Sequence, residues 1–211
     1  MTDMRDHWWW RPGWRPGRRK YAWHFTFRDQ PAVQDLAARA RVLLDGVPGL
    51  DPIPGPWLHL TTQAVGFSDE VRDDDLAAIV AGATSRLAGV PPADVTVGPA
   101  RVLSEAVLCD AHPAGALTLA RDAVRAAIGD VLGPSGIPGR AEWWPHVSLA
   151  YSNADGPVAP VEAALAGFDT VADITLTEIH LILLGRDDHL YEWQNCATVR
   201  LAGAATEASL A

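Results

Sequence analysis

One short pattern occurs twice and constrains the fold more than any other: a histidine, an apolar residue and a hydroxyl residue within an apolar run. The first copy is His59-Leu60-Thr61, and the second, 87 residues later, is His146-Val147-Ser148. In a β-strand, residues i and i+2 point to the same face, about 6.6 Å apart at roughly 3.3 Å per residue. Each copy therefore predicts a strand that presents an imidazole and a hydroxyl side by side.

Two such strands facing each other across a cleft would form a phosphate site that needs no metal. The hydroxyls of Thr61 and Ser148 would hold non-bridging phosphate oxygens. The imidazoles of His59 and His146 would give and take a proton, because the free pKa of histidine lies near neutral pH.

Charge is distributed unevenly along the 211 residues, which suffice for one or two compact units. The formal net charge of −9 argues against a general nucleic-acid binder. Residues 1–20, however, hold six of the 17 Lys and Arg side chains and only two of the 26 acidic ones. The sequence thus predicts a cationic arm over 1–20, attached to an acidic body.

Apolar runs of about 18 residues, which a membrane span needs, do not occur in the sequence, and its polar start does not resemble a signal peptide. We therefore expect a cytoplasmic protein that has no membrane partner. The two cysteines, Cys109 and Cys196, stand in apolar strand-like runs and are predicted to be buried free thiols.

The arm contains the tetrapeptide Trp-Arg-Pro-Gly twice in tandem, over residues 10–17. Pro-Gly pairs favour turns, so an irregular arm is expected instead of a helix. Two interpretations stay open. Trp14, Arg15 and Arg19 could stack on a base and pair with phosphate. Alternatively, the indoles pack against the body and the arginines cover its acidic surface.

Residues 21–28 alternate strictly between aromatic and other side chains, which is the clearest strand signal in the chain. Tyr21, Trp23, Phe25 and Phe27 would share one face. His24 would lie on the other face, which could border the cleft of His59. His24 is either a substrate contact or a structural histidine.

The remaining pattern predicts helices, strands and loops in alternation. Asp73, Asp74 and Asp75 precede an apolar helical stretch, so these acids are interpreted as a helix cap that also complements the helix dipole, and not as metal ligands. We expect helices over 31–44, 75–87, 113–133 and 160–166, strands over 95–97 and 101–109, a hairpin of 174–184 with 190–201, and loops over 46–56 and 134–140.

Each half then runs strand, helix, His strand, helix, which indicates an α+β duplication. The predicted domain spans 21–201 and has two lobes, roughly 21–100 and 101–201, with strand exchange between them left open. A flexible tail is expected over 202–211.

The two His-x-hydroxyl motifs, about 90 residues apart on apolar strands, resemble those of the 2H phosphoesterase superfamily, in particular the bacterial 2′-5′ RNA ligase or RNA 2′,3′-cyclic phosphodiesterase family. The similarity covers roughly residues 21–201, and the arm is similar to that of an actinobacterial branch. The resemblance implies a bilobal fold with antiparallel sheets lining a central cleft, helices outside, and no required metal or cofactor.

The resemblance also implies roles for the motif residues. His59 would be the general acid and His146 the general base, while Thr61 and Ser148 would bind phosphate. From the strand pattern alone, Tyr151, beyond Ser148, and Gln63, beyond Thr61, could also line the cleft, although packing is the alternative for both. The implied activity is a phosphodiesterase acting on 2′,3′-cyclic phosphate or 2′-5′ bonds of RNA termini or nucleotides. Because water is abundant, we expect hydrolysis more than the reverse ligation. We also expect the protein to be a monomer.

Other interpretations stay open. His24, His59 and His146 could converge on a metal, but the sequence has no His-x-His, Cys-x-x-Cys or His-Glu-x-x-His spacing. A serine hydrolase lacks its Gly-x-Ser-x-Gly elbow. The main rival is a non-catalytic nucleotide or RNA-end binding protein that uses the same phosphate clamp. The arm could also recruit another protein.

Overall fold

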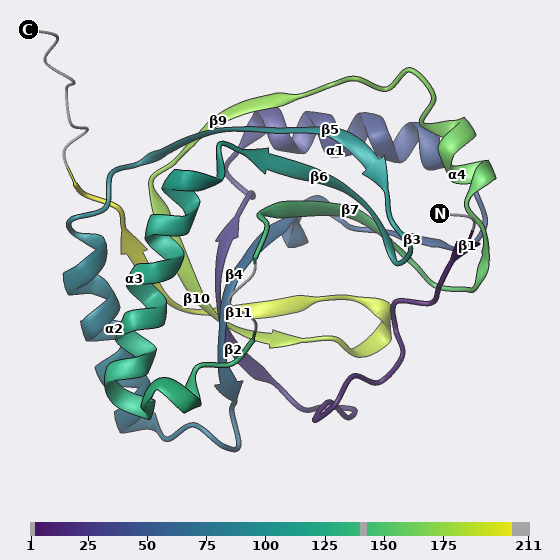
Figure 1. The fold of residues 1–211 in the computed structure, drawn as a ribbon. Coiled ribbons are helices and arrows are strands. Elements are labelled where there is room, and N and C mark those ends of the chain that lie inside the picture. The colour runs from purple at the N-terminus through teal and green to yellow at the C-terminus, as the bar shows by residue number, and fades with distance from the viewer. Residues whose placement is uncertain (1–2, 140–142, 204–211) are drawn as a thin grey trace, which may run out of the picture.

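Two antiparallel sheets face each other in the computed structural model, which describes residues 3–139 and 143–203 (Figure 1). The four-stranded sheet has the order β11-β10-β2-β4, formed by β2 (Lys20–Thr26), β4 (His59–Phe67), β10 (Glu178–Gly185) and β11 (Glu192–Arg200). The five-stranded sheet has the order β3-β7-β6-β5-β9, formed by β3 (Leu50–Pro52), β5 (Ala93–Val102), β6 (Ala106–His112), β7 (His146–Ser152) and β9 (Ala172–Leu176).

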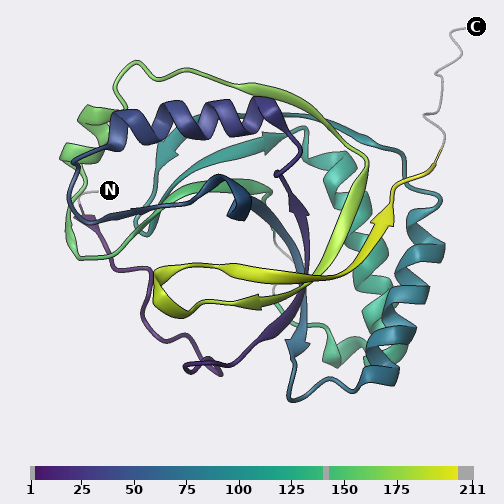
Figure 2. The ribbon, with the colours of Figure 1, turned by 180° about the vertical axis from the view of Figure 1, so that it is seen from behind.

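Helices cover the outer faces of both sheets (Figures 1 and 2). The pair α2 (Asp73–Leu87) and α3 (Ala114–Leu132) packs together and against β11 and β4 of the four-stranded sheet. On the other side, α1 (Pro31–Leu44) contacts β7 and β9, and α4 (Ala159–Ala164) contacts β5. The predicted α+β fold, with antiparallel sheets inside and helices outside, is confirmed.

The two lobes are not contiguous in sequence. β5 follows α2 directly but joins the five-stranded sheet, while β10 and β11 return from the end of the chain to pair beside β2. The helices are exchanged as well. α1 comes early in the chain but packs on the five-stranded sheet, and α3 comes later but packs against β4 of the four-stranded sheet. A division at residue 100 therefore does not describe the lobes. The end of the predicted 134–140 loop and most of the 202–211 tail lie outside the described residues.

Local patterns explain why these elements form where they do. Trp23 and Phe25 of β2, and Phe27 just after its end, are completely buried, as the alternation predicted, while Tyr21 is partly buried. α1 has the predicted bounds and begins with Pro31, whose missing N–H costs nothing at a first helical position. α2 carries its three aspartates in the first turn, where they complement the helix dipole. The predicted cap is wrong, because the N-cap residue is Arg72 and no side chain of the described residues caps the helix.

Two predicted strands differ from the structure. The turn expected between residues 97 and 101 lies instead at residues 103–105, because β5 continues through an irregularity in its ladder with β6 between Val97 and Ala100. Pro99 stands there, at a position where no ladder hydrogen bond is needed from its nitrogen. The strand predicted over 174–184 is two strands, β9 and β10, because the chain leaves one sheet for the other at Thr177. Apolar alternation cannot reveal such a crossing.

The arm is part of the folded body. Its β1 (Asp3–Met4) pairs with β8 (Gly156–Pro157), the Trp8 indole is buried, and β2 already begins at Lys20. The interpretation in which arginines cover acidic surface holds for two of the candidate site residues, as Arg15 pairs with Asp69 and Arg19 with Asp187. Of the two cysteines, Cys109 is buried as predicted, but Cys196 is exposed, and it is the extra residue of a bulge in β11 between Asn195 and Ala197.

Arg186 anchors the arm from the loop after β10. Its side chain is almost fully buried and donates hydrogen bonds to the backbone carbonyls of His7 (3.1 Å) and Trp9 (3.2 Å). The guanidinium also lies 5.5–6.0 Å from four aromatic ring centroids, those of Trp8, Trp10, Trp14 and Tyr191. One buried cation thus joins both turns of the tandem repeat to the body.

Replacement of Arg186 by Met is expected to lower the free energy of unfolding by about 2–4 kcal/mol, because one buried and one partly buried carbonyl lose their donor and the ring contacts disappear. Urea unfolding measures this loss, and limited proteolysis should show new cleavage within residues 5–19. The exposed Arg39, paired with Asp35 along α1, offers the control Arg39→Met, which should cost less than about 0.5 kcal/mol. Equal stability of the two variants would contradict the anchoring role.

Candidate active site

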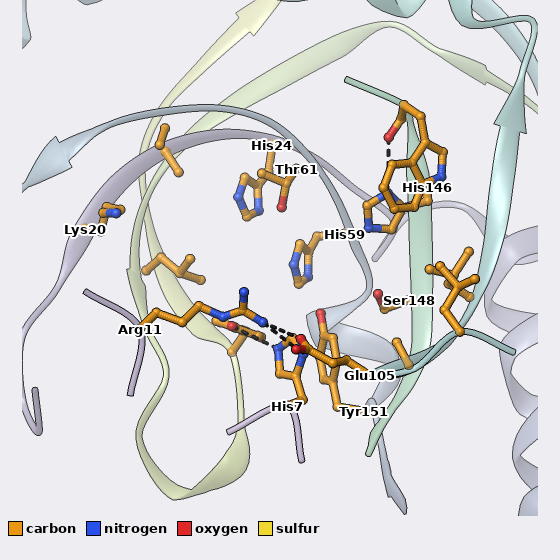
Figure 3. A pocket seen from close by; sticks show the side chains of 18 of the residues that line it. His7, Arg11, Lys20, His24, His59, Thr61, Glu105, His146, Ser148 and Tyr151 are labelled. Carbon is orange, nitrogen blue, oxygen red and sulfur yellow. Dashed lines mark hydrogen bonds and ion pairs between the residues drawn. The ribbon is translucent and has the colours of Figure 1, made fainter. Parts of the chain in front are cut away.

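A cavity of about 490 Å³ lies between the two sheets, and both predicted motifs reach it. From β4 come His59 and Thr61, and from β7 come His146 and Ser148 (Figure 3). The two His strands, far apart in sequence, contact each other in space. The structure therefore brings all four motif residues to one cavity.

Both motif histidines are oriented in the same way. His59 Nδ1 lies 2.8 Å from the carbonyl oxygen of Trp57, and His146 Nδ1 lies 3.1 Å from that of Trp144. A carbonyl oxygen only accepts hydrogen bonds, so Nδ1 carries the hydrogen in each ring. In the neutral form this leaves Nε2 with a lone pair, and in the charged form Nε2 carries a transferable proton.

A β-bulge follows the hydroxyl residue in each His strand. On β4, Thr61 pairs with His24 and Gln63 pairs with the adjacent Trp23, so one extra residue lies between them. On β7, Ser148 pairs with Leu108 and Ala150 pairs with the adjacent Val107. One extra residue shifts the alternation of faces beyond it. The two halves therefore share a β-bulge directly after the hydroxyl residue, which the sequence pattern did not indicate.

The bulges decide which neighbouring residues reach the cavity. Gln63 turns away from it: its amide donates to the Pro138 carbonyl oxygen and accepts from Arg125, so the packing alternative holds. Tyr151 lies three residues beyond Ser148, and strict alternation would turn it away, but the bulge places it on the cavity wall. Ala64 occupies the corresponding place on β4, five residues after its histidine, and also lines the cavity.

His24 lines the cavity from β2 and stacks on the catalytic candidate His59, with ring centroids 4.7 Å apart and planes 12° apart. Its side chain is completely buried, and among the described residues neither ring nitrogen has a hydrogen-bond partner. Burial therefore lowers the pKa of His24 well below its usual value, with the neighbouring His59 as a further cause. A neutral His24 supports the His59 ring from one side.

Both motif histidines also have lowered pKa values. Burial lowers the pKa of His59 to about 4, opposed by its hydrogen bond to Trp57 and reinforced by His146. Burial likewise lowers the pKa of His146, opposed by the Trp144 carbonyl and by Asp110. Both rings are therefore neutral near pH 7, and an anion in the cavity would raise the pKa of each.

The arm forms one wall of this cavity, which sequence reasoning only partly anticipated. Trp14 lines it as proposed, whereas Arg15 and Arg19 do not. Three further arm residues that were not singled out also line it: His7, Arg11 and Lys20. Their positions depend on the β1–β8 pairing and on Arg186, which are long-range contacts that no local pattern encodes.

Tyr191, in the loop before β11, and His7 of the arm also line the cavity. His7 Nε2 lies 3.0 Å from the Tyr191 hydroxyl, and the His7 ring stacks on Tyr151 at 4.1 Å. Arg11 contacts Glu105 at 2.6 Å, so these two opposite charges offset each other. Burial and the neighbouring Arg11 and Arg186 lower the pKa of His7 to about 3.

Over 3–139 and 143–203, no group of three or more His, Cys, Asp or Glu side chains is placed to hold a metal ion. Within the same ranges, every helix is too short or too polar to span a bilayer.

Known proteins with a similar sequence pattern or fold identify the family of this chain. The family model of the 2′-5′ RNA ligase superfamily matches residues 27–188. Among solved structures, TT0787 of Thermus thermophilus has a TM-score of 0.67 at 19% identity, covering 88% of this chain and 100% of its own. E. coli LigT complexed with NADP+ has a TM-score of 0.64 at 16% identity, covering 88% and 99%.

A third structure, the MHV ns2 PDE domain, has a TM-score of 0.54 at 10% identity, covering 79% of this chain and 99% of its own. At such identities the structural likeness shows the shared fold. No curated protein matches the chain in sequence.

Proposed function

The chain belongs to the 2′-5′ RNA ligase superfamily of 2H phosphoesterases, and from this premise we propose that it hydrolyses 2′,3′-cyclic phosphates or 2′-5′ phosphodiester bonds at RNA ends or in nucleotides. One observation carries the proposal: His59 and His146 line one cavity, each with Nδ1 held by a carbonyl and Nε2 left for proton transfer. A purely binding site would not need two histidines prepared in this way.

In the proposed step, His146 Nε2 accepts a proton from water while the water oxygen attacks phosphorus. The bond from phosphorus to the ribose oxygen breaks, and protonated His59 gives its Nε2 proton to that oxygen. Thr61 and Ser148 donate hydrogen bonds to the non-bridging oxygens, which stabilises charge that grows in the transition state. His59 ends neutral and His146 ends protonated, and exchange with solvent restores the starting state.

His59 must be protonated for this step, although burial keeps its pKa at about 4 in the empty cavity. The substrate phosphate supplies the missing stabilisation, because a nearby negative charge favours imidazolium. Protonation of His59 is thus coupled to substrate binding. The neutral His24 behind it adds no competing charge.

Hydrolysis and 2′-5′ ligation are one equilibrium approached from two sides, since a ribose hydroxyl can take the place of water. In dilute solution the concentration of water favours hydrolysis. We therefore propose hydrolysis as the main direction at this site.

A substrate panel tests the proposal. Nucleoside 2′,3′-cyclic phosphates and 2′-5′ dinucleotides are incubated with the protein, and phosphorus NMR follows the appearance of phosphomonoesters. We expect turnover of at least one member of the panel. Tight binding of a member without turnover of any would instead support a non-catalytic nucleotide or RNA-end binding protein.

A further inference from the structure

Lys20 is a cation on the cavity wall to which the proposed reaction assigns no role. Alternate residues of β2 face the cavity, namely Lys20, Ala22 and His24. His24 lies beside Thr61 and His59, whereas Lys20 lies at the start of the strand, where the arm enters (Figure 3). At about 3.3 Å per residue, four residues separate the two backbone positions by roughly 13 Å. Lys20 therefore lies beyond the scissile phosphate.

The Lys20 ammonium is held by aromatic rings. Its Nζ lies 4.2 Å from the Phe67 ring centroid and 5.5 Å from that of Trp14. Within residues 3–139 and 143–203, no carboxylate forms an ion pair with it. Burial lowers the pKa of Lys20, against the opposing influence of Glu70. A partly desolvated cation that has Glu70 as a neighbour but, among the described residues, no carboxylate in direct contact favours an anion from outside.

The other groups on this wall do not supply a net positive charge. Arg11 is paired with Glu105, and burial keeps His7 neutral near pH 7. The indole of Trp14 also lines the cavity, next to the ammonium. A flat aromatic face beside an unpaired cation suits a nucleoside that carries its own phosphate.

We propose that Lys20 binds the 5′-phosphate of the nucleoside whose 2′,3′-phosphate occupies the His59–His146 site. The inference rests on the proposed function for the identity of the scissile group, and it adds that the preferred substrate carries a second phosphate. An RNA 3′ end has this phosphate, and a nucleoside 2′,3′-cyclic phosphate lacks it. The arm thereby acts as a specificity element.

Calorimetry tests this inference without relying on turnover. For the wild type, we expect adenosine 3′,5′-bisphosphate to bind at least about tenfold more tightly than adenosine 3′-phosphate, as one charge-assisted contact would provide. In Lys20→Met, which keeps an unbranched side chain one atom shorter and removes the charge, the ratio should fall to about one or two. Lys20→Arg should keep most of the ratio, and Arg41→Met, at an exposed cation of α1, should keep all of it.

Three results would overturn the inference. The wild type could bind the two ligands equally well, it could bind neither, or the affinity ratio could survive in Lys20→Met. Turnover is then compared for adenosine 2′,3′-cyclic phosphate with and without a 5′-phosphate, and kcat/KM should show the same dependence on Lys20. A Lys20-dependent binding ratio in a protein that hydrolyses neither compound would uphold the second phosphate site and reject the proposed function.

Discussion

Replacing His59 or His146 by alanine is expected to lower kcat for a 2′,3′-cyclic nucleotide by about 10²–10⁴, because each variant lacks one of the two proton-transfer groups. The affinity for the product nucleotide should change much less, since Thr61 and Ser148 remain in place. Steady-state kinetics gives kcat, and calorimetry gives the dissociation constant. The double variant should be little slower than the slower single variant, because the two groups act in one step.

The exposed His112 provides a matched control, as His112→Ala removes an imidazole outside the cavity. Its kcat should equal that of the wild type. If His59→Ala and His146→Ala bound nucleotide normally and retained more than about a tenth of the wild-type kcat, the two-histidine mechanism would be refuted.

Acidification from pH 7 to pH 5 is expected to remove several kcal/mol from the free energy of unfolding. Burial lowers the pKa of His59 to about 4 and of His7 to about 3, and it lowers that of His24 as well. The unfolded chain binds these protons near pH 6.5, whereas the folded chain does not. Stability is therefore fully present above pH 6.5 and is lost as the pH falls toward the folded pKa values.

At pH 5, His59 and His7 each account for a loss of about 2 kcal/mol, at about 1.4 kcal/mol per pH unit below 6.5. Urea unfolding at pH 7, 6 and 5 measures the slope, and carboxylates contribute little in this range. His24→Phe keeps a stacked ring against His59 but cannot bind a proton, so its stability should depend less steeply on pH. Stability that is constant between pH 7 and 5 would show that these histidines are accessible to protons in the folded state.

The sequence contained enough to predict most of the fold and the four motif residues. Helix periodicity, the alternation in residues 21–27 and the two His-x-hydroxyl strands are local patterns, and all reappear in the structure. The crossing at Thr177 escaped prediction because a buried strand has the same apolar pattern in either sheet. Sheet membership is decided by pairing over long distances in the chain.

The cavity wall was predictable only in part, for a similar reason. Whether Gln63 or Tyr151 reaches the cavity depends on bulges that shift the alternation by one residue, and nothing in either motif marks them. The arm was recognised as cationic and aromatic, but its contribution to the cavity follows from contacts of Arg186 with residues more than 170 positions away.

One measurement tests the central claim most directly: the rate at which the protein, dialysed against EDTA and assayed with EDTA present, hydrolyses 2′,3′-cyclic nucleotides. The proposed mechanism assigns every proton transfer to His59 and His146, so we expect full kcat under these conditions and its loss in His146→Ala. Activity that EDTA abolished and added zinc restored would contradict the mechanism.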